Sequence, residues 1–278
     1  MKDTLYIIKV GSNIIDDEEK LKSFLSSFAF IDDKKILVHG GGKLATQLAE
    51  KLGVKQKLIE GRRITDAETL KIVTMVYAGF INKNIVAQLQ SRDCNAVGLC
   101  GADGNTILAH KRKPNAHPKG SDEIVDYGYA GDIDGVNTDL LDDLLQKKIT
   151  IVFAPITHNK AGQLLNTNAD TIAQEIAKAL SNLYETTLVY TFEKAGVLID
   201  IDNDNSVIRE LNWSYYQQLK SPRQPAGMGA SKIFSGMIPK LDNAFAALNS
   251  GVKKVIIGKA EQLKELINGQ SGTNIVNE

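Results

Sequence analysis

The chain has 278 residues, 43% of them hydrophobic, and is long enough to bury a sizeable core as one large or two modest domains. Lys plus Arg and Asp plus Glu number 33 each, so no net charge attracts nucleic acid or an anionic membrane. Cys94 and Cys100 form no CxxC or Cys/His cluster, which is typical of small core residues in a reducing compartment. No apolar run approaches the roughly 20 residues that span a bilayer, so we expect a soluble cytoplasmic protein.

Short apolar runs rich in β-branched residues alternate along the chain with longer stretches of helical period. Strands are expected in LYIIKV (5–10), KILVHG (35–40), AVGLC (96–100), TIVFAPI (150–156), TTLVY (186–190) and VKKVIIG (252–258). Helices are expected over 17–30, 43–52, 65–92, 138–148, 168–182 and 240–250. Strands that are apolar throughout and separated by helices predict a largely parallel sheet covered on both faces, and so an α/β fold.

Polar residues mark the helix starts and the loops. Thr65, Asn137 and Asn168 are the expected N-caps of the third, fourth and fifth of these helices. The turn-rich stretch 110–135 is typical of a hairpin or surface excursion. A soft boundary near 181–186 divides the chain into 1–182 and 183–278.

The segment VHGGG (38–42) joins an expected strand to an expected helix. Its glycines would let backbone N–H groups at a helix N-terminus approach an anion closely. Gly40, Gly42 and Ala45 also satisfy a G-x-G-x-x-A pattern with Glu60 about 20 residues on, which leaves a nicotinamide-dependent oxidoreductase as an alternative. We expect His39 to form hydrogen bonds within the core.

A lone lysine interrupts the first apolar strand, in IIKVGS (7–12), just before a glycine. The sequence has no G-x-x-x-x-G-K-[ST] loop, no HRD or DFG set, no G-x-S-x-G elbow and no H-E-x-x-H. P-loop, protein kinase, hydrolase and zinc-protease frameworks are therefore not indicated.

Six motifs nearly span the chain: IIKVG, VHGGG, GRRITD (61–66), AVGLCGADG (96–104), GQLLNTNADTIA (162–173) and SGMIPKLDNA (235–244). In this order and spacing the chain resembles the amino acid kinase family. Within that family it is similar to the branch that uses ATP to phosphorylate the γ-carboxylate of N-acetyl-L-glutamate in arginine biosynthesis. The resemblance implies a three-layer α/β/α sandwich with a mainly parallel central sheet. The first lobe would bind the N-acylglutamate and dimerise, and the second would bind ATP.

The resemblance also assigns catalytic residues. Lys9 and Lys240 would be the two cations beside the phosphoryl group in transfer, and Asp170 would hold both lysines without acting as a base. A carboxylate is already ionised at neutral pH, so its attack on phosphorus needs no general base. Catalysis must then come from positioning and from cations.

Ligand contacts follow from the same resemblance. Those for the substrate are Gly41, Gly42, Asn166 and Arg63, with Arg63 favoured over Arg62 for the α-carboxylate; Asn168 would serve as a helix cap only. Those for ATP are Gly11, Ser12, Thr191, Lys194, Gly196 and Lys232. Mg²⁺ would arrive with ATP, with no dedicated protein metal site.

Quaternary structure is also implied. The helix in 65–92 would form a homodimer interface. The chain begins a few residues before its first strand, so we expect no N-terminal helix of the kind that interlocks arginine-inhibited hexamers, and hence a dimer without arginine feedback.

Three departures from the family pattern keep alternatives open. Ser12 stands where a second glycine is usual, as in glutamate 5-kinase; Phe192 takes the place of an aspartate near the nucleotide; Thr157 and His158 replace a glycine. An N-succinyl-L-glutamate kinase, which would need an extra cation or donor, and glutamate 5-kinase therefore remain alternative enzymes. A sensor that has lost turnover is the non-enzymatic alternative.

Overall fold

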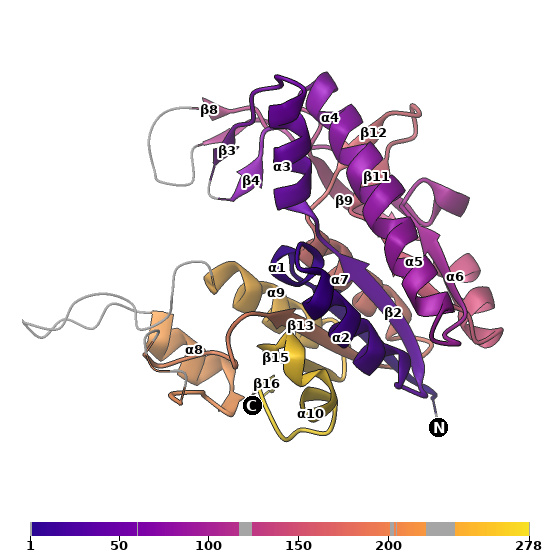
Figure 1. Cartoon of the computed structure of the whole chain (residues 1–278). Helices are drawn as coiled ribbons and strands as arrows, with labels where there is room; N and C mark the ends of the chain where they lie inside the picture. The colour runs from indigo at the N-terminus through magenta and orange to yellow at the C-terminus, as the bar shows by residue number, and fades with distance from the viewer. Residues whose placement is uncertain are drawn as a thin grey trace, which may run out of the picture.

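The fold is built on one large sheet (Figure 1). The structure is a computed structural model, and it describes residues 2–59, 61–116, 124–200, 203, 205–220 and 237–277. Within these ranges eight strands lie in the order β14-β16-β15-β13-β1-β2-β10-β5. Their bounds are β1 Thr4–Val10, β2 Lys34–His39, β5 Ala96–Leu99, β10 Thr150–Phe153, β13 Glu185–Phe192, β14 Glu210–Leu211, β15 Lys254–Lys259 and β16 Thr273–Ile275.

β1 lies in the middle of this sheet, between β2 and β13, and is parallel to both. β10, β5 and β15 extend the parallel arrangement, and β16 pairs antiparallel with β15. Ile7 and Ile8 on β1 point to opposite faces and are both fully buried. The apolar runs are therefore strands covered on both sides, which confirms the expected mainly parallel α/β fold.

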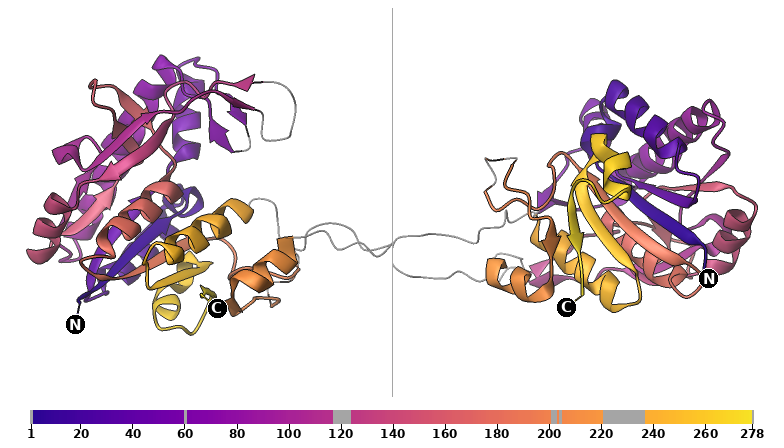
Figure 2. Two further views of the ribbon diagram at one scale, coloured as in Figure 1. Left: turned by 180° about the vertical axis from the view of Figure 1, so that it is seen from behind. Right: turned by 90° about the horizontal axis from the view of Figure 1, so that it is seen from below.

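Helices cover both faces. α6 (Thr138–Gln146), α7 (Ala169–Leu180) and α9 (Ile238–Asn249) lie on one face; α7 and α9 are seen in front of the sheet in the left panel of Figure 2. α2 (Glu18–Ala29), α5 (Asn82–Gln90) and α10 (Leu263–Ile267) cover the other. The remaining helices are α1 Ser12–Ile15, α3 Gly42–Lys51, α4 Ala67–Thr74, α8 Trp213–Lys220, a π-helical stretch Met75–Ile81 and 3₁₀ turns at Asp103–Asn105 and Ala260–Gln262.

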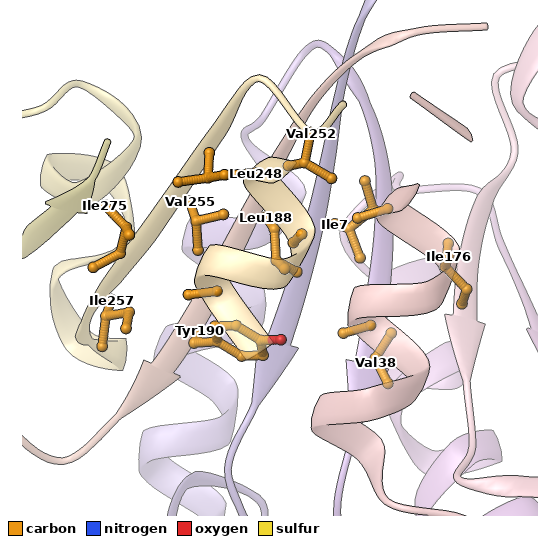
Figure 3. Close-up of a cluster of buried hydrophobic side chains, with 14 of the residues drawn as sticks. Ile7, Val38, Ile176, Leu188, Tyr190, Leu248, Val252, Val255, Ile257 and Ile275 are labelled. Atoms are coloured by element: carbon orange, nitrogen blue, oxygen red, sulfur yellow. The ribbon is translucent and has the colours of Figure 1, made fainter. Parts of the chain in front are cut away.

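Figure 3 shows the core beneath α7 and α9. Ile7, Leu188 and Val255 come from neighbouring strands of the sheet and meet Ile176 on α7 and Leu248 on α9. All but Leu248, at 5% exposed, are completely buried. Burying side chains of this size contributes on the order of 2 kcal/mol each, which fixes the helices against the strands that carry the site.

A second set of strands stands beside the carboxyl ends of the large sheet, with α3 and α4, at the top of Figure 1. It is a four-stranded sheet in the order β12-β11-β6-β9 and two short hairpins. The bounds are β6 Ile107–Lys111, β9 Gly131–Val136, β11 Ile156–His158 and β12 Leu164–Asn166, with hairpins β3 Leu58–Ile59/β4 Arg62–Arg63 and β7 Asn115–Ala116/β8 Ile124–Val125. β6 and β9 pair antiparallel, so the excursion expected at 110–135 is a hairpin extension, of which 117–123 lie outside the described residues.

Two local predictions were wrong. The N-cap of α4 is Asp66 and not Thr65: the Asp66 carboxylate accepts from the Thr69 N–H, while the buried Thr65 hydroxyl donates to the Arg63 carbonyl. The expected single strand 150–156 divides at Ala154 and Pro155 into β10 and β11, which belong to different sheets.

Other local predictions are confirmed. Asn137 and Asn168 are N-caps, as expected. Cys94 is buried and Cys100 partly buried, and both are free thiols packed in the core. No helix within the described residues is long and apolar enough to cross a membrane.

Candidate active site

The site begins where β1 and β2 end side by side. Lys9 is the penultimate residue of β1, and the backbone N–H of Gly40, just after β2, donates to the Val10 carbonyl. A Cβ added to Gly40 would lie 3.3 Å from the Ser12 hydroxyl oxygen, so the two turns are in close approach. Ligands of parallel α/β sheets bind at these carboxyl ends of the strands.

Three charged side chains from distant parts of the sequence meet here. The Lys9 ammonium lies 2.9 Å from Oδ1 of Asp170, and the Lys240 ammonium lies 2.5 Å from Oδ2. β1 carries Lys9, the first turn of α7 carries Asp170, and the first turn of α9 carries Lys240. Asn168 caps α7 by accepting from the Asp170 N–H, which fixes where the carboxylate emerges.

Burial and charge shift the protonation equilibria of this group. Desolvation lowers the pKa of Lys9, and the neighbouring Lys240 lowers it further, whereas the Asp170 carboxylate raises it. Desolvation would raise the pKa of Asp170, but the two ammonium groups outweigh it and hold that pKa well below its usual range. Asp170 is therefore ionised throughout the physiological range and acts as a fixed counter-charge.

The glycine segment forms the second wall. Gly41 is the N-cap of α3 and has φ +147°, where a side chain is strained. An added Cβ would lie 2.3 Å from Cδ1 of Ile81 and 3.1 Å from the Tyr77 ring, both in the π-helical stretch. Only glycine fits, and the free N–H groups of the first turn of α3 are left facing the pocket.

A buried network fixes this segment from behind. The His39 ring makes a 2.8 Å contact through Nδ1 with the Gly40 carbonyl, and Asn82 donates through Nδ2 to the Val152 carbonyl and lies 3.2 Å from Nε2 of His39. Both side chains are fully buried, and burial lowers the pKa of His39 to about 4. His39 is thus neutral, with Nδ1–H as donor and Nε2 as acceptor, and lies in the core as expected.

A cavity of about 810 Å³ opens between these walls. Lys9, Ser12, Gly41, Gly42, Arg63, Asn166 and Asp170 all line it. The structure therefore brings together the catalytic candidates Lys9 and Asp170 and all four predicted substrate contacts, and Lys240 joins them through Asp170.

Two of those contacts already have partners in the protein. The Arg63 guanidinium donates to the Gly42 carbonyl, to the Thr46 hydroxyl and to the Gln56 amide oxygen. Asn166 donates through Nδ2 to the Thr65 hydroxyl. These bonds hold both side chains at the cavity wall before any ligand arrives, whereas Arg62, which also lines the cavity, is exposed.

The predicted ATP contacts are more scattered. Gly11 and Ser12 lie at the β1 turn, but the buried Thr191 donates its hydroxyl to the Lys9 carbonyl and so links β13 to β1. Gly196 packs against Thr273, where an added Cβ would lie 2.7 Å from the hydroxyl oxygen. Of these four only Ser12 lines the cavity. Lys194 is half-buried in the loop after β13, and Lys232 lies outside the described residues.

The cavity is also lined by residues that sequence reasoning did not single out, among them the cations Lys43 and Arg112 and the aromatic residues Tyr77 and Tyr127. Lys43 follows the triple glycine directly and could have been suspected from that position. Arg112 lies in a polar turn-rich stretch with no pattern that distinguishes it from other surface cations.

The departure at Thr157 lies behind the cavity wall. Its buried hydroxyl is 2.7 Å from that of Thr167, and both face Gly131, where an added Cβ would lie 3.0 Å and 2.5 Å away respectively. Thr157 and His158 do not line the cavity, whereas Thr167 and Gly131 do. The substitution therefore fills space behind the wall.

A parallel α/β sheet with two lysines and a glycine turn at the carboxyl ends of its strands has the features of an enzyme that binds phosphate. Residues 4–259 match the sequence profile of the amino acid kinase family, and the chain belongs to that family. Acetylglutamate kinase of Cytophaga hutchinsonii is 53% identical over 98% of both chains, and that of Bacteroides fragilis is 49% identical over 99% of this chain and 98% of its own. A Streptococcus mutans crystal structure, 24% identical and covering 98% of both chains, superposes with a TM-score of 0.74 and has the same fold.

Proposed function

We propose that the chain is an acetylglutamate kinase, which transfers the γ-phosphoryl group of ATP to the γ-carboxylate of N-acetyl-L-glutamate in arginine biosynthesis. The observation that carries this is the pair of ammonium groups of Lys9 and Lys240 held on the one carboxylate of Asp170 beside the glycine segment. The named relatives, at about half identity over nearly the whole chain, support the same activity.

The reaction joins two anions. An oxygen of the substrate carboxylate attacks the γ-phosphorus, the bond from that phosphorus to the bridging oxygen breaks, and ADP leaves with the electron pair. No proton has to be removed, because the carboxylate is ionised. The barrier is repulsion between anions, so preorganised cations have the largest effect.

Each member of the charged group has its own part in this reaction. Lys9 and Lys240 donate to the equatorial oxygens of the phosphoryl group and to the leaving oxygen. Asp170 keeps the two ammonium groups adjacent and charged. Without this carboxylate, the repulsion between two like charges in a partly buried site would favour the loss of a proton from one of them. The α3 N-terminus at Gly41 and Gly42 adds backbone donors.

The remaining substrate groups bind farther along the cavity wall. Arg63 pairs with the α-carboxylate and Asn166 with the substrate backbone. Residues 1–182 thus bind the amino-acid substrate, and residues 183–278 contribute Lys240 and bind ATP. The reaction takes place in the cytoplasm.

ATP binds at the β1 turn and the loop after β13, with Gly11, Ser12, Thr191, Lys194, Gly196 and Lys232 as the proposed contacts. Among the described residues no three His, Cys, Asp or Glu side chains gather as a metal site. Mg²⁺ enters with the ATP phosphates and its own water ligands.

The surface of the long helical segment supports a homodimer. Met75 and Phe80, in the π-helical stretch, are 54% and 65% exposed. Large apolar side chains exposed together on one helix suit a protein interface. Light scattering coupled to size exclusion tests this: a monomer that stays monomeric at high concentration would reject the dimer.

The activity is tested by ATP-dependent hydroxamate formation with N-acetyl-L-glutamate, N-succinyl-L-glutamate and L-glutamate in parallel. We expect kcat/KM to be highest for N-acetyl-L-glutamate. A preference for N-succinyl-L-glutamate or for L-glutamate would change the assigned substrate but not the reaction type, which is ATP-dependent phosphorylation of a carboxylate. No product with any of the three would reject a carboxylate kinase in favour of a sensor.

A further inference from the structure

Arg112, just after β6, is a cavity-lining cation that the proposed mechanism does not use. Its guanidinium donates from Nε and Nη2 to the Asp132 carboxylate on β9, and its Nε lies 3.0 Å and 3.1 Å from the two carboxylate oxygens. The guanidinium carbon lies 5.6 Å from the centre of the Tyr127 ring, which also lines the cavity. The side chain is only 17% exposed. Arg112 is therefore held rigidly on one edge.

The other edge of the guanidinium is available. Of its five N–H donors, one on Nε and one on Nη2 engage Asp132, which leaves both hydrogens of Nη1 and one of Nη2. Nη1 has no hydrogen-bond partner among the described residues. Fork-shaped presentation of paired donors suits oxygen acceptors.

Backbone bonds place Arg112 away from the reacting end. Asp170 marks that end, and Asn166 precedes it by one short connection. Ala130 forms a parallel bridge with Asn166, and the Arg112 N–H donates to the Ala130 carbonyl. Each such step between neighbouring strands is about 4.8 Å, so the Arg112 backbone lies about two strand spacings from that of Asn166.

The substrate has three groups of oxygens to be recognised. The γ-carboxylate faces Lys9 and Asp170, and Arg63 on the α3 side is proposed for the α-carboxylate. The N-acyl oxygen is the group left without a partner. Lys43, Arg62 and Arg112 are cavity-lining cations with no ligand assigned, and of these three Lys43 and Arg62 are exposed whereas the Arg112 side chain is largely buried.

We propose that Arg112 is a specificity-determining residue that donates hydrogen bonds to an oxygen of the substrate's N-acyl group. This rests on the proposed function of the same site. The acceptor is the amide carbonyl oxygen of an acetyl group or the terminal carboxylate of a longer dicarboxylic acyl chain, and the guanidinium recognises both. Asp132 and Tyr127 position Arg112.

The test compares Arg112→Gln with the wild type in kcat and KM for N-acetyl-L-glutamate and N-succinyl-L-glutamate. Glutarate, which has both carboxylates of the substrate but no acylamino group, is measured as a competitive inhibitor. We expect KM for the acylated substrate to rise about 10- to 100-fold, the range for a lost hydrogen bond to a charged group, with less than a threefold change in kcat. The inhibition constant of glutarate should stay within twofold.

The two acceptors give different results. A larger rise in KM for N-acetyl-L-glutamate assigns the amide oxygen, and a larger rise for N-succinyl-L-glutamate assigns the terminal carboxylate. An equal rise for glutarate, or no change in KM, overturns the proposal. Turnover by the wild type alone decides the proposed function. If the wild type shows no turnover, the affinities of the wild type and Arg112→Gln for the acylated substrates and for glutarate are compared by calorimetry.

Two controls separate recognition from folding. Arg112→Gln leaves the Asp132 carboxylate unpaired, so the double variant Arg112→Gln/Asp132→Asn removes that carboxylate and should show the same rise in KM. Lys111→Gln changes the preceding residue, which is exposed and does not line the cavity. It should leave both kinetic constants unchanged, and a rise in KM there equal to that in Arg112→Gln would overturn the assignment.

Discussion

Replacing Asp170 by Asn removes the one negative charge between two ammonium groups and keeps the shape of the side chain. Coulomb's law at an effective dielectric constant of about 20 gives about 6 kcal/mol of attraction for unit charges 2.9 Å apart, the separation of Lys9 and Asp170. Part of this is offset because both charges are largely removed from water. We expect about 3 to 4 kcal/mol to be lost from transition-state stabilisation, which slows turnover by roughly two to three orders of magnitude.

The pH dependence distinguishes this explanation from simple damage to the fold. Desolvation and Lys240 both lower the pKa of Lys9, and Asp170 opposes them. Without Asp170 the pKa of Lys9 falls further, so Lys9 loses its proton as pH rises. The variant should therefore become faster as pH falls from 8 to 6, whereas the wild type should change little.

The assay is steady-state turnover followed by ADP release, with urea unfolding of both proteins to correct for stability. Glu175→Gln is the matched control. Glu175 lies on the same helix as Asp170 but does not line the cavity, and its carboxylate lies 2.9 Å from the Lys178 ammonium. It should stay within twofold of wild type. Turnover of Asp170→Asn within tenfold of wild type, or a rate that falls with falling pH, would refute the counter-charge role.

Lys9→Ala and Lys240→Ala should each slow turnover about a hundredfold or more, and a near-normal rate in either would reject that lysine's role. Gly41→Ala places a Cβ 2.3 Å from Cδ1 of Ile81 at a backbone φ of +147°. We expect urea unfolding to show a loss of about 2 kcal/mol or more in stability, partly restored when Ile81→Ala is added. An unchanged urea midpoint would contradict the conclusion that only glycine fits here. Burial lowers the pKa of His39 from 6.5 to about 4, so the contribution of the neutral ring to the free energy of unfolding is complete above pH 6.5 and is lost as pH falls toward 4. His39→Asn should flatten the pH dependence of that free energy by about 3 kcal/mol across this window. An unaltered slope would be inconsistent with a neutral buried ring.

The sheet could be predicted because its strands are apolar on both faces. Each of the six expected strands overlaps a strand of the structure. β14 and β16 were missed because two or three residues are too few to show a period, and they are fixed by pairing with β15 and with each other.

Helix interiors were more predictable than helix details. The apolar spacing over 65–92 indicates one long helix, and the structure has α4, a π-helical stretch and α5 in continuous succession. No sequence pattern distinguishes the wider π-helical turn, which here brings Tyr77 and Ile81 against Gly41. Thr65 and Asp66 are both good caps, and the tertiary hydrogen bonds of Thr65 with Tyr127, Tyr129 and Asn166 decide between them.

The candidate site was predictable where a short motif carried its residues. Lys9, Asp170 and Lys240 lie in three separate motifs, and the structure places both ammonium groups within hydrogen-bonding distance of the Asp170 carboxylate. Their roles, and those of Arg63 and Asn166, remain predictions. Arg112 could not be found in this way because its position depends on the pairing of β6 with β9, which carries its partner Asp132.

The charge of the Lys9, Asp170 and Lys240 group follows from the reaction it has to serve. Two ammonium groups and one carboxylate leave a net charge of +1 at the place where the phosphoryl group passes between two anions. A net charge of +2 would bind ADP and the acyl phosphate more tightly and slow their release, while a net charge of zero would not offset the repulsion between the reactants. At pH 6, where Lys9 keeps its proton and the variant has the net charge of +2, Asp170→Asn should thus lower KM for ATP as it lowers kcat. A variant that loses turnover and raises KM for ATP together would show instead that Asp170 mainly positions the lysines.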